Sequence, residues 1–249
     1  MELRSSFGSN SPVNEPGLNI LDGPLKSSHS PGLPVHILLN GIFGPFLHMT
    51  GDKKTATRQQ IVTAAQDLFG SSGFKQTGMS QIAAACQMSA ANLYRFFPSK
   101  VEIGEAVVLQ HIAHSAKISE LVTKLEADAQ GKIRRFVLET LEYNYRHFHG
   151  KPHLLQLIEF VSQKLPHLQE KHKKIKLGTL LNILTQGQQN GQVVQGPVKQ
   201  QAQLMMMALR GFLFPHLLLV GGPPLKDLNQ QAEMLVKMMF SGIGTSVDE

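Results

Sequence analysis

Residues 79–100 read MSQIAAACQMSAANLYRFFPSK, and this stretch decides the fold of the chain. Its pattern predicts two short helices, Met79–Cys86 and Ala90–Phe96, joined by a tight turn. Ser89 stands directly before the second helix and is a residue type that caps helix N-termini. The pattern is typical of a helix-turn-helix, which we place at about residues 77–97. Such a motif inserts its second helix into the major groove of DNA.

Small and apolar residues predict how these two helices pack. Ile82, Met88 and Leu93 are expected to form a small core between them. Ala83, Ala84 and Ala91 are small enough to let the helices cross closely. The same pattern also fits an alanine-rich hairpin within a helical bundle, so it does not by itself establish DNA binding.

A longer amphipathic helix precedes the motif. Ile61, Ala65 and Phe69 recur at the 3.6-residue spacing of one helix face. Thr57 and Gln60 have the spacing of a capping box, which predicts that the helix begins there. We expect it to stop at Gly70–Gly73, where glycine can adopt the left-handed conformation that closes a helix.

Nearly all of the downstream sequence is predicted to be helical. Pro98 and Ser99 open a long helix from about Lys100 to Ala127, with an apolar stripe of Ile103, Val107, Ile112 and Leu121. Glycines and prolines separate further helices at about residues 131–149, 152–165, 167–189, 197–220 and 225–241. Pro215 is expected to kink or split the helix at 197–220. No alternation typical of strands competes, so the predicted fold class is all-α.

Several short runs resemble the signature of the TetR family of bacterial transcriptional regulators. They are Ile82-Ala83, Met88-Ser89, Leu93-Tyr94 and Phe97-Pro98-Ser99-Lys100, and the resemblance covers about residues 55–105. It implies an N-terminal three-helix helix-turn-helix domain at 50–100. It also implies a C-terminal helical domain at 101–249 for effector binding and dimerisation.

The resemblance also implies roles for individual residues. Tyr94 and Lys100 match the phosphate contacts of the family, and Thr77 and Ser89 are expected to touch phosphate as well. The remaining recognition-helix positions are expected to face the bases: Ala90, Ala91, Asn92 and Arg95. Asparagine prefers adenine and arginine prefers guanine. Two positions depart from the family pattern, since Gln87 replaces a turn glycine and Gly78 replaces a frequent threonine.

The function implied is that of a repressor, released from a palindromic DNA operator by a small-molecule effector. The protein is expected to act as a homodimer, for which Leu204–Leu209 and Met234–Phe240 are apolar enough. An activator, or a regulator without a ligand, stays open. The alternative class is a helical protein-interaction module that does not bind DNA. The effector and its binding residues cannot be named from the sequence.

The net charge is compatible with a polyanionic partner but does not establish one, because many basic proteins bind no nucleic acid. The chain carries 24 basic and 18 acidic residues, a net charge of +6. Residues 50–104 hold six basic and three acidic residues, so half of this excess lies around the motif. Phosphate binding needs such an excess and depends steeply on salt.

Other chemistry has little support in the sequence. Cys86 is the single cysteine, which excludes an intrachain disulfide, and we expect it to be packed rather than reactive. No enzyme motif and no cofactor site is found, so we expect a non-enzyme. His149 and His153 have metal-ligand spacing, but Gly150 and Pro152 interrupt the helix between them, so no metal is expected. The run Lys171–Lys176 fits a solvated helix face better than a nucleic-acid patch.

The N-terminal stretch differs in composition. Residues 1–48 hold six prolines and no helical period, so we expect a disordered or non-native extension, with Met49 as the natural start. A native peptide that begins upstream of Met49, detected by mass spectrometry, would contradict this hypothesis. No segment has the uninterrupted apolar length of a membrane span, which predicts a cytoplasmic protein without a membrane partner.

Overall fold

Ten helices make up the part of the chain that the structure describes, and no strand occurs there. The computed structural model describes residues 53–214 and 222–243, which belong to one compact unit, Gly51–Glu249. The helices are α2 (Lys53–Ser72), α3 (Met79–Ala85), α4 (Ala90–Phe96), α5 (Lys100–Thr123), α6 (Ala129–Phe148), α7 (Pro152–Lys164), α8 (Pro166–Gln189), α9 (Val198–Ala208), α10 (Arg210–Leu213) and α11 (Leu225–Ile243). The all-α prediction is therefore confirmed. The expectations for residues 1–48 lie outside the described residues.

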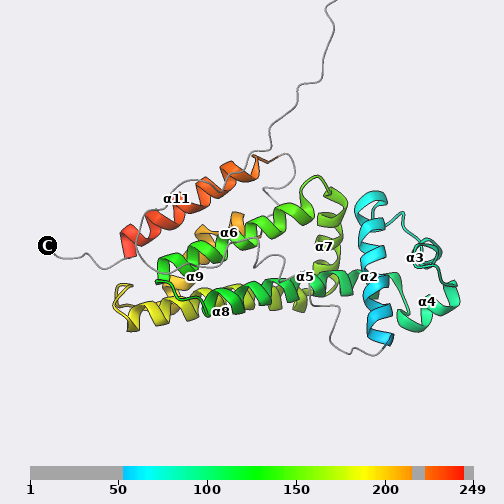
Figure 1. Cartoon of the computed structure of the whole chain (residues 1–249), viewed down its shortest axis with the longest axis horizontal. Coiled ribbons are helices and arrows are strands. Elements are labelled where there is room, and N and C mark those ends of the chain that lie inside the picture. The colour runs from blue at the N-terminus through cyan, green and yellow to red at the C-terminus, as the bar shows by residue number, and fades with distance from the viewer. Residues whose placement is uncertain (1–52, 215–221, 244–249) are drawn as a thin grey trace, which may run out of the picture. The chain divides into compact units, whose positions relative to one another are not determined.

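The helices pack around two apolar clusters. The first joins α2, α3 and α4 to the N-terminal half of α5 and to α7. The second joins the end of α5 to α6, α8, α9, α10 and α11. Helices α5, α6 and α8 lie side by side, whereas α3 and α4 lie at the far end of the unit beyond α2 (Figure 1).

The start of α2 differs from the prediction. The helix begins at Lys53, and the hydroxyl of Thr57 donates a hydrogen bond back to the Lys53 carbonyl at 2.8 Å. A capping threonine would instead accept a bond from a backbone amide. The capping-box prediction at Thr57 and Gln60 is therefore wrong, because a threonine inside a helix can bond to the carbonyl four residues earlier. The predicted stop is confirmed, since Gly73 has φ +88° directly after Ser72.

The boundary between α5 and α6 also moves. We predicted that the first helix reaches Ala127, but it ends at Thr123. The next helix begins at Ala129, because the Asp128 side chain caps it and accepts a bond from the Gly131 amide at 2.6 Å. An aspartate three residues before a free amide is a typical N-cap.

The predicted helix at 197–220 is broken earlier than Pro215. Helix α9 ends at Ala208 and the single turn α10 follows, which buries both Leu209 and Leu213. Phe214 has φ −129° and ψ 83°, outside the helical region. Proline disfavours a helical conformation in the residue before it, which explains the stop. Pro215 itself lies outside the described residues.

None of these helices is long and apolar enough to cross a membrane, within the residues described.

Candidate nucleic-acid interface

The interface is built on α4, a helix of only seven residues. Ser89 caps its N-terminus, with the hydroxyl accepting a hydrogen bond from the Asn92 amide at 3.2 Å. Leu93 is fully buried and attaches the helix to the first apolar cluster. So short a helix is not stable by itself, and these two contacts hold it in place.

Most predicted DNA-contacting residues lie together on the outer face of α4. Six of the eight predicted residues belong to α4 or to its N-cap. Asn92 is half-buried, and the other five are exposed: Ser89, Ala90, Ala91, Tyr94 and Arg95. Tyr94 has half of its surface exposed, which is unusual for so large an apolar ring. The face therefore combines a phenol, a guanidinium, an amide and small residues that allow close approach.

The turn before α4 has the strain that the sequence suggested. Gln87 has φ +54°, a left-handed conformation that glycine adopts without cost. The Met88 amide donates to the Ala83 carbonyl at 2.9 Å, and the Gln87 amide donates to the Ala84 carbonyl at 3.0 Å. This pair of bonds is a Schellman motif, which closes α3 and sets the direction of α4.

The contact between α3 and α4 is partly as predicted. Ile82 and Leu93 are buried and Met88 packs against the same cluster, so the predicted small core is confirmed. Only Ala83 lies inside the crossing, because Ala84 and Ala91 are exposed. The expectation that all three alanines serve the helix crossing is therefore wrong, since Ala84 and Ala91 lie on the outward faces of their helices.

Arg58 on α2 is a functional candidate that the sequence analysis missed. Its guanidinium donates a hydrogen bond to the Phe96 carbonyl, at the last residue of α4. The same group lies over the Phe97 ring, 4.0 Å from its centroid. Arg58 therefore anchors the C-terminal end of α4 to α2. Only its position on an otherwise polar face of α2 could have indicated this.

Thr77 does not lie on the outer face with the others. Its side chain is almost fully buried, and its hydroxyl and its amide both donate to the Gly73 carbonyl, at 2.8 and 3.1 Å. The next amide, of Gly78, donates to the Gln81 side chain at 2.7 Å. In this structure the loop before α3 therefore uses its donors internally.

Lys100 also points inward. Its ammonium donates to the carbonyls of Phe74 and Thr77, at 2.7 and 2.8 Å, and lies 4.7 Å from the centroid of the Phe74 ring. Partial burial lowers the pKa of Lys100 below its usual value. The residue braces the loop between α2 and α3, which is a positioning role.

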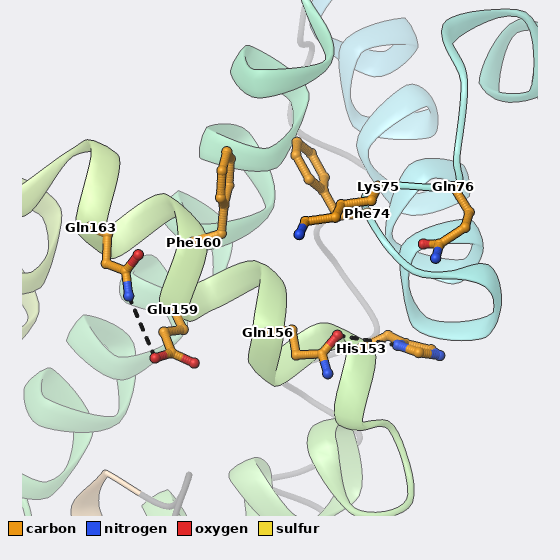
Figure 2. A pocket seen from close by; sticks show the side chains of 8 residues that line it. All are labelled: Phe74, Lys75, Gln76, His153, Gln156, Glu159, Phe160 and Gln163. Carbon is orange, nitrogen blue, oxygen red and sulfur yellow. Dashed lines mark hydrogen bonds between the residues drawn. The ribbon is translucent and has the colours of Figure 1, made fainter.

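A cavity of about 410 Å³ adjoins the same loop. Figure 2 shows Phe74, Lys75 and Gln76 of the loop opposite side chains of α7, among them His153 and Phe160. The rings of Phe74 and Phe160 lie 5.1 Å apart. On α5, a side chain at Gly104 would come within 3.2 Å of both Leu157 and Phe74, so this glycine allows the close packing. Helix α7 thus contacts the loop that supports α3.

Three further residues or runs that the sequence singled out can be placed. His149 is the C-cap of α6 and His153 is the second residue of α7, and no metal-binding group of residues occurs among the residues described. Cys86 is half-buried, and burial raises the pKa of its thiol. The run Lys171–Lys176 is exposed at three lysines, but Lys176 is fully buried. The solvated-face interpretation is wrong for that residue, because it lies one turn after His172 on the inner face of α8.

The sequence of this region matches a known family. Residues 61–107 match the model described as bacterial regulatory proteins, tetR family. Over 54 residues the chain is 37% identical to the HTH-type transcriptional regulator UidR of Escherichia coli strain K12. These 54 residues are 22% of this chain and 28% of UidR. The regulator of the same name from Shigella flexneri matches equally. The match thus spans less than a third of the length of these curated relatives.

Solved structures share the fold over 75–78% of this chain. A TetR-family transcriptional regulator from Mesorhizobium loti has a TM-score of 0.61 at 18% identity, over 78% of this chain and all of that one. The SmeT–triclosan complex has a TM-score of 0.60 at 18% identity, over 77% and 93% of the two chains. A transcriptional regulator from Cytophaga hutchinsonii has a TM-score of 0.59 at 22% identity, over 75% and 98%. At these identities the likeness concerns the fold. The family likeness is carried by the matched segment, residues 61–107, which is similar to bacterial regulatory proteins of the tetR family.

Proposed function

We propose that this protein is a transcription regulator that binds double-stranded DNA through α4. The observation that carries the proposal is the outer face of α4, where Tyr94 and Arg95 stand exposed on a helix held rigidly from behind. Arg95 and Asn92 have the donors and acceptors that read base edges. Tyr94 and Ser89 have hydroxyls that suit phosphate oxygens.

For Thr77 and Lys100 the proposed role differs from the phosphate contact that the resemblance implied. Thr77 and Lys100 have their donors engaged within the protein. We therefore propose that they position the loop before α3, and that their effect on DNA binding is indirect. Residues 50–100 would form the DNA-binding domain and residues 101–249 the effector and dimerisation domain.

We further propose that the protein is a homodimer on a palindromic operator. Four large apolar side chains of α9 and α11 are exposed: Leu204, Met207, Met234 and Met238. Exposed apolar side chains of this number on two helices favour a protein–protein contact. A two-fold dimer presents two recognition helices to two half-sites, on operator DNA in the cytoplasm.

The regulator would act as a repressor that a small molecule releases. The name of SmeT states that it represses a multidrug efflux pump of Stenotrophomonas maltophilia, and one SmeT structure holds triclosan. For this chain the support is the contact of α7 with the loop at Phe74. A shift of α7 on effector binding would move that loop and change the spacing of the two α4 helices. Such coupling requires that the effector binds one of the two states more tightly.

A gel-shift titration tests DNA binding. The probe is DNA from upstream of the protein's own gene, at several salt concentrations. We expect binding that weakens steeply as salt rises. Arg95→Ala should relax the preference at particular base pairs, and Tyr94→Phe should weaken binding to all sequences. Lys171→Ala, an exposed lysine on α8, is the matched control and should change neither.

The rival function is a helical interaction module that does not bind DNA. Absence of binding at every salt concentration would favour it. If Arg95→Ala and Tyr94→Phe lose affinity equally on every sequence, the assignment of base and phosphate contacts is wrong.

A further inference from the structure

Lys176 is a buried lysine in the middle of α8. It has no exposed surface, and its ammonium has no hydrogen-bond partner among the described residues. The centroid of the Phe214 ring lies 5.0 Å from the ammonium nitrogen. Taking a charged group out of water without an acceptor is costly, so the position needs a reason beyond packing.

Two polar side chains of α6 have the same property. The hydroxyl of Thr140 and both amide atoms of Asn144 are buried and have no hydrogen-bond partner among the described residues. The two residues are four apart, so they share one face of the helix. An unsatisfied buried amide costs about 1–3 kcal/mol, and three such residues in one core are more than packing requires.

Lys176 contacts one member of a group of rings contributed by α5, α6, α8 and the end of α10, and Asn144 follows another member, Tyr143, on α6. We name this the ring cluster; its members are His111, Tyr143, Phe148, His172 and Phe214. His172, one turn before Lys176, lies 5.0 Å from the His111 ring and 5.4 Å from the Phe214 ring. The His111 ring lies 5.5 Å from the Tyr143 ring and 5.1 Å from the Phe148 ring. Tyr143 comes directly before Asn144 on α6, and Phe148 comes four residues after it. Ring contacts thus connect Lys176 and its neighbour His172 on α8 with the part of α6 that carries Asn144.

We propose that the ring cluster and these three polar side chains form the effector site, and that the effector is an organic carboxylate with an apolar body. The proposal rests on the regulator function proposed above and deepens it. The carboxylate would accept hydrogen bonds from the ammonium of Lys176, the amide of Asn144 and the hydroxyl of Thr140. The apolar body would replace the contacts that the rings now make with one another. One lysine suits a single negative charge better than the double charge of a phosphate monoester.

The protonation of Lys176 agrees with an anion as its binding partner. Burial lowers the pKa of its ammonium to about 7, so the lysine is only partly charged at neutral pH. An anion beside an ammonium raises its pKa again and favours the charged form. Lysines 171, 173 and 174 are exposed on the same helix, so the buried one is the exception.

Thermal unfolding of the full chain, without DNA, tests the inference. The probes are benzoate, phenylacetate and decanoate, each paired with its neutral primary amide. We expect at least one acid to raise the Tm while its amide does not. Lys176→Met keeps the length of the side chain and removes the charge, and it should weaken binding of that acid about tenfold or more, as the loss of a hydrogen bond to a charged group does. Lys174→Met, exposed on the same helix, should bind the acid as the wild type does.

A second variant guards against a change in folding. Asn144→Leu leaves Lys176 in place, and it should also weaken binding of the acid, measured by calorimetric titration. The inference is overturned if no acid raises the Tm, if acid and amide act equally, or if Lys176→Met binds the acid with unchanged affinity. A chain that binds acids and not DNA would refute only the proposed regulator function. A chain that binds DNA and is indifferent to acids would refute only the carboxylate site.

Discussion

Lys100 shows how one residue can fit two roles that only its geometry distinguishes. By resemblance it is a phosphate contact, yet its ammonium donates to the Phe74 and Thr77 carbonyls. We predict that Lys100→Met lowers the free energy of unfolding by about 1–2 kcal/mol, because these carbonyls lose a charged donor. Urea denaturation measures the change, without DNA. Lys75→Met, an exposed lysine of the same loop, is the control and should be nearly neutral. If Lys100→Met and the wild type are equally stable, the positioning role is wrong and Lys100 is better assigned as a phosphate contact.

Gln87 carries strain that a glycine would remove. Its φ of +54° places a side chain in the left-handed region, which costs about 1–2 kcal/mol, while glycine adds chain entropy worth about half of that. We predict that Gln87→Gly raises the free energy of unfolding by up to about 1 kcal/mol. Ala84→Gly, at an exposed position inside α3 where φ is not positive, should instead destabilise. A loss of stability in Gln87→Gly would mean that the glutamine side chain makes an offsetting contact.

Lys176 should make stability depend on pH. Its pKa is about 7 in the folded chain and near its usual 10.5 when unfolded, so between these values the unfolded state holds the extra proton. Stability therefore rises with pH from about 7 to 10.5 and is flat below, relative to a variant without the amine. Lys176→Met should be more stable than wild type at pH 6 by roughly 5 kcal/mol at most. The gap should close as pH nears 10.5; equal pH profiles would contradict the buried charge.

These residues also show how far the sequence alone can lead. Gln87 and Ser89 could be predicted because a turn and a cap depend on neighbouring residues only. Lys176 could not be, because burial depends on which face of α8 meets α5 and α6, and its neighbours Lys173 and Lys174 suggest solvent. Its helical spacing from Thr179 and Leu180, both buried, was the available signal.

At the scale of elements, α4 is too short to hold itself and depends on its anchors. Arg58 binds its C-terminal carbonyl and stacks on Phe97. We predict that Arg58→Met lowers DNA affinity by a similar factor on all sequences and lowers stability by about 1 kcal/mol. Gel shifts on two unrelated operators and urea denaturation measure both effects. Lys53→Met removes an equal charge from α2 and should keep stability. Loss confined to one operator would make Arg58 a base-reading residue instead.

Helix existence was easier to predict than helix ends. Every helix from α2 to α9 and α11 was expected near its observed place, because glycines, prolines and apolar periodicity mark each one. Ends were set by particular contacts, such as the Asp128 cap of α6. The break at Leu209 comes two residues before Gly211, and Leu209 and Leu213 are both buried in one core. That burial depends on helices distant in sequence.

At the scale of the whole molecule, the apolar faces of α9 and α11 bear on assembly. On α11, Leu228, Ala232 and Val236 are buried, whereas Met234 and Met238 are about two-thirds exposed. On α9, Met207 is 71% exposed while Ala202 and Met205 are buried. Each helix therefore buries one apolar face in the core and exposes further apolar side chains to solvent. A monomer does not need these exposed apolar side chains.

We predict that Met207→Glu with Met238→Glu converts the proposed dimer to a monomer in sedimentation analysis, because each subunit would bury two unpaired charges at the interface. The monomer should bind a full palindromic operator about 100-fold more weakly, since the second recognition helix is no longer tethered. Binding to DNA with a single half-site should not change, because α4 is untouched. Val194→Glu, an exposed apolar residue outside these helices, is the control and should stay dimeric. A variant that stays dimeric would place the interface elsewhere, whereas a monomeric variant with full operator affinity would show that one recognition helix suffices.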